Sequence, residues 1–274
     1  MDRAAVIGAP GSAAAKVARQ LADLMKVQEY TAFADDEAKD RAPGVVLTHS
    51  AEAMPEGIPL VVFIDDAPLR KDSRDEWREA ALARLAGAQA AGNAVVILED
   101  SAAAKRWIRR LRDEGLPVPR PLRRVFVAAA LSPGCDSLVS ALEGTLGLAA
   151  RHPDREGDVL SEGWGRVYAS AAEGERWLVQ SASWHAVEYL IPRADAVIHL
   201  PGTVEPRTAP ERRTWRFMFG AWFARYPRIE AGLLSRNLSG LSHLTAIYTV
   251  RNEFELAAVI AGFSGAAAPA APAT

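Results

Sequence analysis

The sequence predicts an α/β protein made of two doubly wound parallel-sheet domains in tandem. Short apolar runs alternate with longer amphipathic stretches, each half opens with a strand-like run followed by a glycine- or proline-containing turn, and the second half repeats the plan of the first. Continuous short apolar runs are typical of parallel strands buried on both faces. Their alternation with helices favours a sheet that is covered on both sides.

The first half begins with the apolar run Ala4–Ile7, the turn Gly8–Ser12 and a helical stretch over Ala13–Lys26. That helix is predicted from apolar residues recurring on one face. The elements predicted after it are strands at Val45–Thr48, Leu60–Ile64 and Ala94–Leu98, and helices at Arg74–Ala91 and Ala102–Glu114.

A stiff connector separates the halves. Leu116–Leu122 holds three prolines in seven residues, which favours an extended chain. We therefore predict a first domain at residues 1–116, a linker at 117–124 and a second domain at 125–264. Residues 265–274 are almost all Ala and Pro, a composition typical of a disordered tail.

The second half follows the same order of elements. Its opening run, Val125–Leu131, leads through Ser132–Gly134 into a helical stretch over Asp136–Leu148. The remaining elements are strands at Trp177–Gln180, Ala196–Leu200 and Thr245–Val250, and a helix over about Glu253–Gly262. The ordered matches between the halves indicate a duplication, although identity between them is low.

The first turn carries a phosphate-binding pattern that lacks two of its functional residues. Val6-Ile-Gly-Ala-Pro-Gly-Ser12, followed by Val17-Ala-Arg-Gln-Leu21, resembles the phosphate loop of P-loop kinases. The pattern calls for a lysine that reaches the phosphates and a hydroxyl that binds Mg²⁺. Ala14 and Ala15 occupy these positions. Lys16 is two residues late, about 200° around the helix, and cannot simply replace the lysine.

The second turn departs further from the pattern. Aligned on the following helix, the first glycine is Ala129, the lysine position is Cys135 and the hydroxyl position is Asp136. A carboxylate at a helix start competes with phosphate for the same N–H groups. We interpret Asp136 as an ordinary helix N-cap.

The second half otherwise resembles adenylate-kinase-like and topology-modulation-type nucleotide kinases. The similarity covers Arg176–Gln180, Ala186–Leu190 and Arg193–Pro201. It implies that Arg207, Arg212 and Arg213 belong to a lid that neutralises a transferring phosphoryl group. The acidic residue that the family carries after a strand falls near Gln180-Ser181 here, where no carboxylate stands.

Two enzymatic alternatives stay open. One is an active nucleotide kinase or NTPase that uses Lys16 as an unconventional lysine. The other is a dinucleotide-dependent reductase of the Rossmann type, although Gly8-x-x-Gly11 lacks the full glycine fingerprint and no tyrosine has a lysine four residues later. Asp65 and Asp66 follow a strand and are weak candidates for metal ligands, with a turn at the strand end as the more common reading.

Composition excludes several classes of partner. The net charge of −2 and the absence of a long apolar run predict neither nucleic-acid nor membrane binding. A single cysteine excludes an intrachain disulfide, and we expect a cytoplasmic protein. Six aromatic residues lie within residues 213–228, more than one helix face buries. They either pack in a core or form a surface for a protein partner or a second copy, and we predict the surface.

We therefore expect a catalytically impaired P-loop kinase-like protein that serves as a nucleotide-binding or protein-interaction module. The nucleotide site that the resemblance implies uses Gly8, Pro10, Gly11, Ser12 and Lys16 in the first domain, and Arg207, Arg212 and Arg213 in the second. Its cofactor, if one binds, would be ATP with Mg²⁺ in the first domain, because only that loop keeps its glycines.

Overall fold

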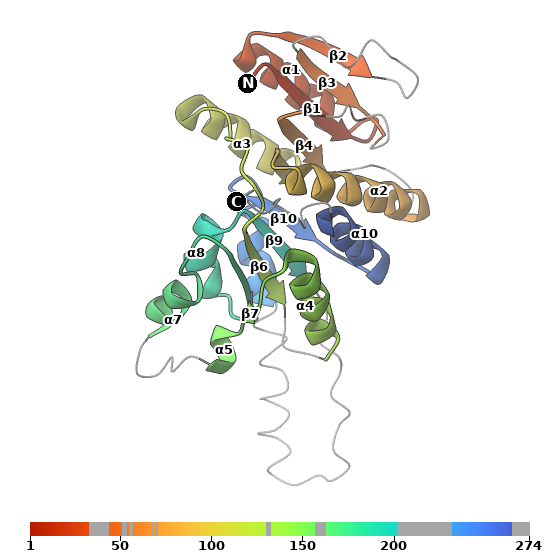
Figure 1. Cartoon of the computed structure of the whole chain (residues 1–274). Helices are drawn as coiled ribbons and strands as arrows, with labels where there is room; N and C mark the ends of the chain where they lie inside the picture. The colour runs from red at the N-terminus through yellow and green to blue at the C-terminus, as the bar shows by residue number, and fades with distance from the viewer. Residues whose placement is uncertain are drawn as a thin grey trace, which may run out of the picture. The chain divides into compact units, whose positions relative to one another are not determined.

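The protein consists of two compact units, which we describe separately from a computed structural model (Figure 1). One unit comprises Met1–Leu122, Gly240–Tyr248 and Asn252–Thr274, and the other comprises Arg123–Ser239 and Thr249–Arg251. The described residues are 1–32, 44–50, 54, 57–66, 68, 71–129, 133–156, 163–201 and 232–264.

The first unit is built on a five-stranded sheet. Its strands are β1 (Arg3–Gly8), β2 (Gln28–Ala32), β3 (Gly44–Thr48), β4 (Leu60–Ile64) and β5 (Ala94–Leu98). Their order is β2-β3-β1-β4-β5, and each pairing is parallel. β3, β4 and β5 are buried along their whole length, as expected for strands covered on both faces.

Helices α1 (Ala14–Met25) and α3 (Ser101–Glu114) pack against each other and against this sheet. Each buries an apolar stripe, and the two stripes join the strands in one core. The start of α3 is capped by Asp100, whose Oδ1 accepts a hydrogen bond from the backbone N–H of Ala103 at 2.6 Å. The residue at the start of α1, Ala13, has no side chain that can cap the helix.

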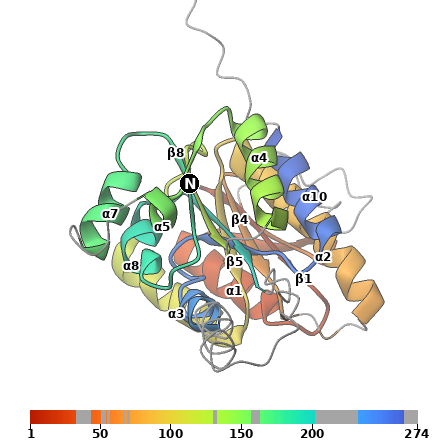
Figure 2. The same cartoon turned by 90° about the horizontal axis from the view of Figure 1, so that it is seen from below.

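Helix α2 (Lys71–Ala90) packs along the C-terminal helix α10 (Glu253–Phe263), and Figures 1 and 2 both show the two side by side. Gly262 permits this close approach, because a Cβ there would lie 2.6 Å from the carbonyl oxygen of Ala83. Nearby, the buried Tyr248 hydroxyl donates to Gln89 Oε1 at 2.6 Å. The sequence had assigned this last helix to the second half, whereas its packing on α2 places it in the first compact unit.

The second sheet has the same strand order as the first. Its strands are β6 (Arg124–Ala129), β7 (Ala150–Arg151), β8 (Trp177–Ser181), β9 (Ala196–Leu200) and β10 (Ala246–Thr249). They lie in the order β10-β9-β6-β8-β7, which from first strand to fifth is again 2-3-1-4-5. The strands that match in sequence therefore occupy equivalent places in the two sheets, with the first strand of each half at the centre.

Within the described residues, the second half contains the helical segments α4 (Pro133–Leu146), α5 (Pro153–Glu156), α7 (Trp164–Ala171), α8 (Ala186–Leu190), the 3₁₀ turn η2 (Ile191–Arg193) and residues 232–239. Nowhere in the described ranges is a helix both long enough and apolar enough to span a bilayer.

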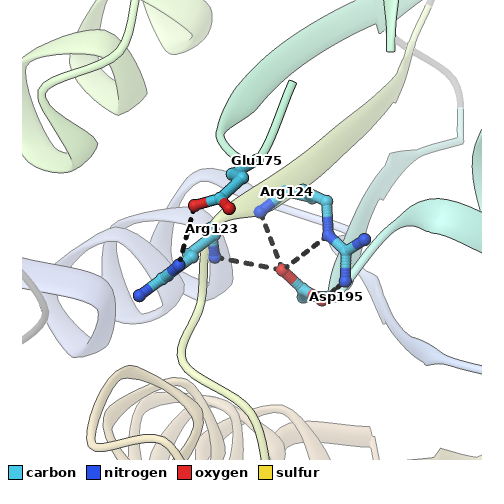
Figure 3. Close-up of polar contacts among 4 residues, drawn as sticks. All are labelled: Arg123, Arg124, Glu175 and Asp195. Atoms are coloured by element: carbon cyan, nitrogen blue, oxygen red, sulfur yellow. Dashed lines mark hydrogen bonds and ion pairs between the residues drawn. The ribbon is translucent and has the colours of Figure 1, made fainter. Parts of the chain in front are cut away.

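Asp195 joins the starts of two neighbouring strands, β6 and β9 (Figure 3). Its carboxylate accepts hydrogen bonds from the backbone N–H groups of Arg123 and Arg124, at 3.1 and 2.9 Å. It also accepts one from Arg124 Nη2 at 2.8 Å. This bonding raises the pKa of Arg124 against the opposing effect of burial. Arg123 also faces Glu175 at 3.4 Å, a solvent-exposed pair of little energetic weight.

The prediction of an α/β protein with two parallel sheets is confirmed. The strand order is not the 3-2-1-4-5-6 order of classical dinucleotide-binding domains. The Rossmann-type reductase alternative therefore has no support in the topology.

Candidate functional site

The candidate site of the first unit lies where the central strand β1 ends. In open α/β sheets, ligands bind beyond the carboxyl ends of the strands. Here β1 runs into the turn Gly8–Ser12 and then into α1, while the neighbouring strand β4 ends beside it at Ile64. The residues that follow these two strands therefore meet at one edge of the sheet.

The turn after β1 needs both of its glycines. A Cβ on Gly8 would overlap that of Ala14 and would lie 2.8 Å from Ser12 Oγ. Gly11 has a φ of +82°, in the region that favours glycine. The N–H of Ser12 donates to the carbonyl oxygen of Ala9 at 3.1 Å, which closes the turn. The predicted loop thus has a compact strand–turn–helix form.

The backbone N–H groups at the start of α1 already have side-chain acceptors. The carboxylate of Asp66 accepts a hydrogen bond from the N–H of Ala13, with 3.3 Å between Oδ2 and the nitrogen. Ser12 Oγ accepts one from the N–H of Ala14, also at 3.3 Å. A carboxylate from the chain therefore lies at the helix N-terminus, where a phosphate loop would hold its anion.

Two further positions in α1 correspond to functional residues of the phosphate loop that the turn resembles in sequence. Ala14, in the place of the phosphate-binding lysine, is buried against the sheet. Ala15, in the place of the Mg²⁺-binding hydroxyl, is exposed and has no polar atom to offer. Lys16 is exposed, and within the described ranges its side chain makes no hydrogen bond or ion pair. The structure therefore does not bring Lys16 into the turn.

Asp65 and Asp66, the weak metal candidates, have separate roles. Asp65 is buried and accepts a hydrogen bond from Arg78 Nε at 2.8 Å, while Asp66 serves the start of α1. Arg78 is also buried and pairs with Glu255 of α10 through its Nη1. The described residues contain no cluster of three or more acidic, histidine or cysteine side chains that could hold a metal.

Arg78, Asp65 and Glu255 form a buried ion triad that stabilises the fold and does not bind phosphate. Burial acts to lower the pKa of Arg78, but the charges and hydrogen bonds of Asp65 and Glu255 outweigh it, so the pKa is raised. The guanidinium thus stays charged between two buried carboxylates. Because it is only 1% exposed, it cannot reach a ligand in solution.

The second loop is described from Pro133 on, because residues 130–132 lie outside the described ranges. α4 begins at Pro133, so Asp136 lies in its first turn and is not the N-cap that the sequence suggested. The reason is that proline is well tolerated at the first helical position and lets the helix start earlier. A carboxylate in the first turn still favours the helix and disfavours a phosphate there.

A carboxylate does reach the end of β8, where the resemblance led us to look for one. Asp154, from α5, accepts hydrogen bonds from Ser181 Oγ at 2.9 Å and from the N–H of Ala182 at 2.7 Å. It also accepts one from the Tyr168 hydroxyl at 2.8 Å. Burial, followed by the Asp154 charge, raises the pKa of Tyr168 well above its ordinary value. Asp154 therefore holds β8, α5 and α7 together.

Gln180 links three elements beside this carboxylate. Its Nε2 donates to the carbonyl oxygen of Ala129 at 3.2 Å and lies 3.6 Å from the sulfur of Cys135. With its amide nitrogen so placed, its Oε1 faces His152 Nδ1 at 2.7 Å. In this arrangement His152 Nδ1 is the donor to Gln180 Oε1.

His199 is the fourth of the five residues of β9 and is buried. Burial lowers its pKa to about 4, so the ring is neutral near pH 7. Its Nε2 lies 3.1 Å from Ser235 Oγ, in the helix over residues 232–239. His199 is therefore a buried packing residue of the second unit.

The predicted site residues divide into three groups. The structure brings Gly8, Gly11 and Ser12 together at the start of α1, with Pro10 exposed in the same turn. It leaves Lys16 outside that turn. Arg207, Arg212 and Arg213, together with the aromatic segment 213–228, lie outside the described residues.

The sequence did not predict the groups that bind the carboxylates of Asp66 and Asp154. A signal existed for Asp66, because it directly follows the strand beside β1 and so had to lie near the first turn. No comparable signal marked Asp154, which reaches Ser181 across 27 positions in the chain from a four-residue helix.

No protein-family model matches the chain, and no curated protein is similar to it in sequence. Among solved structures, the chain is similar to the "Crystal structure of NadR protein in complex with NR". That similarity has 12% sequence identity and a TM-score of 0.31, and it covers 94% of this chain and 86% of that one. At this level it carries no argument about fold or activity. The description of the chain as α/β rests on the strand order of its own two sheets.

Proposed function

We propose that the protein is a catalytically impaired P-loop kinase-like protein whose role is to bind a protein partner rather than to transfer phosphate. One observation carries the proposal: the Asp66 carboxylate lies at the N-terminus of α1, where a phosphate loop would bind its anion. The substitutions at Ala14 and Ala15 support it, because they remove the groups that bind phosphate and Mg²⁺.

Electrostatic magnitudes favour this reading. Phosphoryl transfer depends almost wholly on positioning and on cations that stabilise the transferring group. Two unit charges about 4 Å apart interact by about 4 kcal/mol at an effective dielectric constant of about 20. A phosphate beside ionised Asp66 would therefore lose about a thousandfold in affinity, and the loop offers no lysine to offset the loss.

The second unit also has acidic residues where phosphate binding would need cations. Asp136 lies in the first turn of α4, and Cys135 occupies the lysine position. The nearby carboxylate of Asp154 accepts hydrogen bonds from three protein groups. A carboxylate engaged in this way is a poor general base or metal ligand, because binding another group would break contacts that hold α5 and α7 in place.

We place the partner surface on the aromatic segment 213–228 and keep Arg207, Arg212 and Arg213 as flanking cations. This part of the proposal rests on composition, since aromatic side chains and arginine are enriched at interfaces. A surface on the protein, rather than a nucleotide pocket, also agrees with the blocked anion site of the first unit.

Turnover measurements test the proposal directly. Purified protein with Mg²⁺ and radiolabelled ATP is expected to release no phosphate and to phosphorylate no nucleoside or nucleoside monophosphate above a heat-denatured blank. Lys16→Ala and Arg212→Ala are the matched variants. Turnover that either substitution abolishes would sink the proposal and establish the active-kinase alternative.

A further inference from the structure

The outer face of α3 carries a row of cations. Lys105, Arg109 and Arg112 are spaced four and three residues apart, so they lie on one side of the helix. Arg106 stands beside them, and all four side chains are exposed. At about 1.5 Å per residue, the row extends over about 10 Å, or two helical turns.

We call Lys105, Arg106, Arg109 and Arg112 the cationic face of α3. None of the four side chains forms an ion pair or hydrogen bond within the described ranges. The neighbouring Arg110 instead pairs with Glu114, with 2.5 Å between Nε and Oε2. The chain as a whole is slightly acidic, at −2, so the row is a local departure from the average charge.

A nearby histidine responds to this field. Partial burial and then the charges of Arg106 and Arg110 lower the pKa of His243, against smaller opposing effects from Gly240 and Glu114. The positive potential is therefore felt by a group on another segment of the same unit.

The size and surroundings of the face restrict its partner. Acidic residues close both ends of the row, with Glu99 and Asp100 before the helix and Asp113 and Glu114 at its end. A long polyanion such as nucleic acid, or an anionic membrane, would meet these carboxylates. The exposed face also has no aromatic side chain on which a base could stack, because Trp107 is buried.

We propose that the cationic face of α3 binds a short acidic helix of a partner protein, with carboxylates spaced four and three residues apart. Such a helix matches the row in length and in periodicity, and arginine binds carboxylates with two parallel hydrogen bonds. The inference rests on α3 alone and is independent of whether the chain turns over ATP.

A labelled peptide tests the proposal on the full chain. The probe is a stapled helical peptide with glutamates at i, i+4 and i+7, and its control has the same composition with the glutamates distributed around the helix. Fluorescence anisotropy in about 50 mM NaCl should show binding that weakens about tenfold or more at about 300 mM, since screening acts on exposed charges.

Charge reversal identifies the surface. Arg109→Glu/Arg112→Glu should weaken binding of the probe by about tenfold or more, while Arg84→Glu/Arg166→Glu, which changes the net charge equally at other exposed positions, should leave it within about twofold. Arg109→Gln/Arg112→Gln serves if the reversed variant does not fold, and Arg109→Lys/Arg112→Lys should retain most of the binding.

Several results would overturn the proposal. These are no binding of the probe, equal binding of the control peptide, or equal losses in the two reversed variants. Tighter binding of single-stranded RNA or of phosphatidylserine vesicles than of the probe would show a different class of partner. Self-association that Arg109→Glu/Arg112→Glu abolishes, without peptide binding, would replace the partner helix with a second copy of the chain.

Discussion

The carboxylate of Asp66 lies 3.3 Å from the backbone nitrogen of Ala13 and caps the start of α1 from another strand. The helix has no capping side chain at Ala13 itself. In this arrangement an acidic residue from the end of β4 neutralises the positive end of the helix dipole. The glycine turn is thereby kept in shape without a bound anion.

Asp66 should contribute modestly to stability. Asp66→Ala removes a cap and leaves the N–H of Ala13 without its acceptor, so we expect a loss of about 1 kcal/mol in the free energy of unfolding. Asp66→Asn keeps an acceptor oxygen and should lose less. Urea unfolding followed by circular dichroism measures both. A loss for Asp66→Ala no larger than for an exposed control, Arg84→Ala, would show that the contact does not matter.

Arg78 should be among the most sensitive positions in the first unit. Arg78→Met leaves the buried carboxylates of Asp65 and Glu255 without their cation, which typically costs about 3–5 kcal/mol. Replacing all three with Leu, Met and Leu should recover much of that loss, because no buried charge remains. Chemical unfolding of the two variants checks this. Equal instability of both would contradict the assignment to an ion triad.

The charge of Asp154 should influence the titration of Tyr168. Burial and the Asp154 carboxylate raise the pKa of Tyr168 in the folded state, so its phenolate should form only at a pH above that of an ordinary tyrosine. Asp154→Asn removes the charge and should lower the pKa of Tyr168 while weakening the bond to Ser181. Ultraviolet titration, with Tyr168→Phe to identify the signal, measures the shift. An unchanged titration in Asp154→Asn would refute the coupling.

His199 should make the second unit sensitive to acid. Its folded pKa is about 4, below the ordinary value of 6.5, so the unfolded chain takes up a proton first as the pH falls. Stability is therefore unaffected by His199 above about pH 6.5 and declines between about pH 6.5 and 4, by up to about 3 kcal/mol. His199→Gln should flatten this part of the pH profile, as followed by thermal melting. A profile as steep as that of the natural chain would contradict the role.

The sequence predicted the strands that are apolar runs, including the edge strands β5 and β10, and missed the two strands that are not. β3, β4, β8 and β9 fall within one residue of their expected ranges, because parallel strands covered on both faces read as apolar runs. β2 and β7 were missed. Each lies at the edge of its sheet, and their residues, Gln28–Ala32 and Ala150–Arg151, do not form an apolar run.

The site was predictable as a turn but not as a set of contacts. The spacing of the glycines in Gly8–Ser12 is enough to predict a tight turn between a strand and a helix. Whether an anion can bind at the N-terminus of α1 depends on Asp66, which is 53 positions after Ala13 in the chain. Asp66 reaches that position because β4 lies beside β1. Pairing between strands is a property of the folded sheet, so local patterns could mark Asp66 as a candidate without showing what it does.

Binding of MgATP to the natural chain and to Asp66→Asn is the measurement that tests the central claim most directly. Isothermal titration and thermal melting are read together, since a ligand at about one hundred times its Kd stabilises by about 2.7 kcal/mol. We predict no heat and no shift in Tm for the natural chain, with Asp66→Asn gaining measurable affinity for MgATP or tripolyphosphate. Saturable MgATP binding by the natural chain that Lys16→Ala removes would contradict the account.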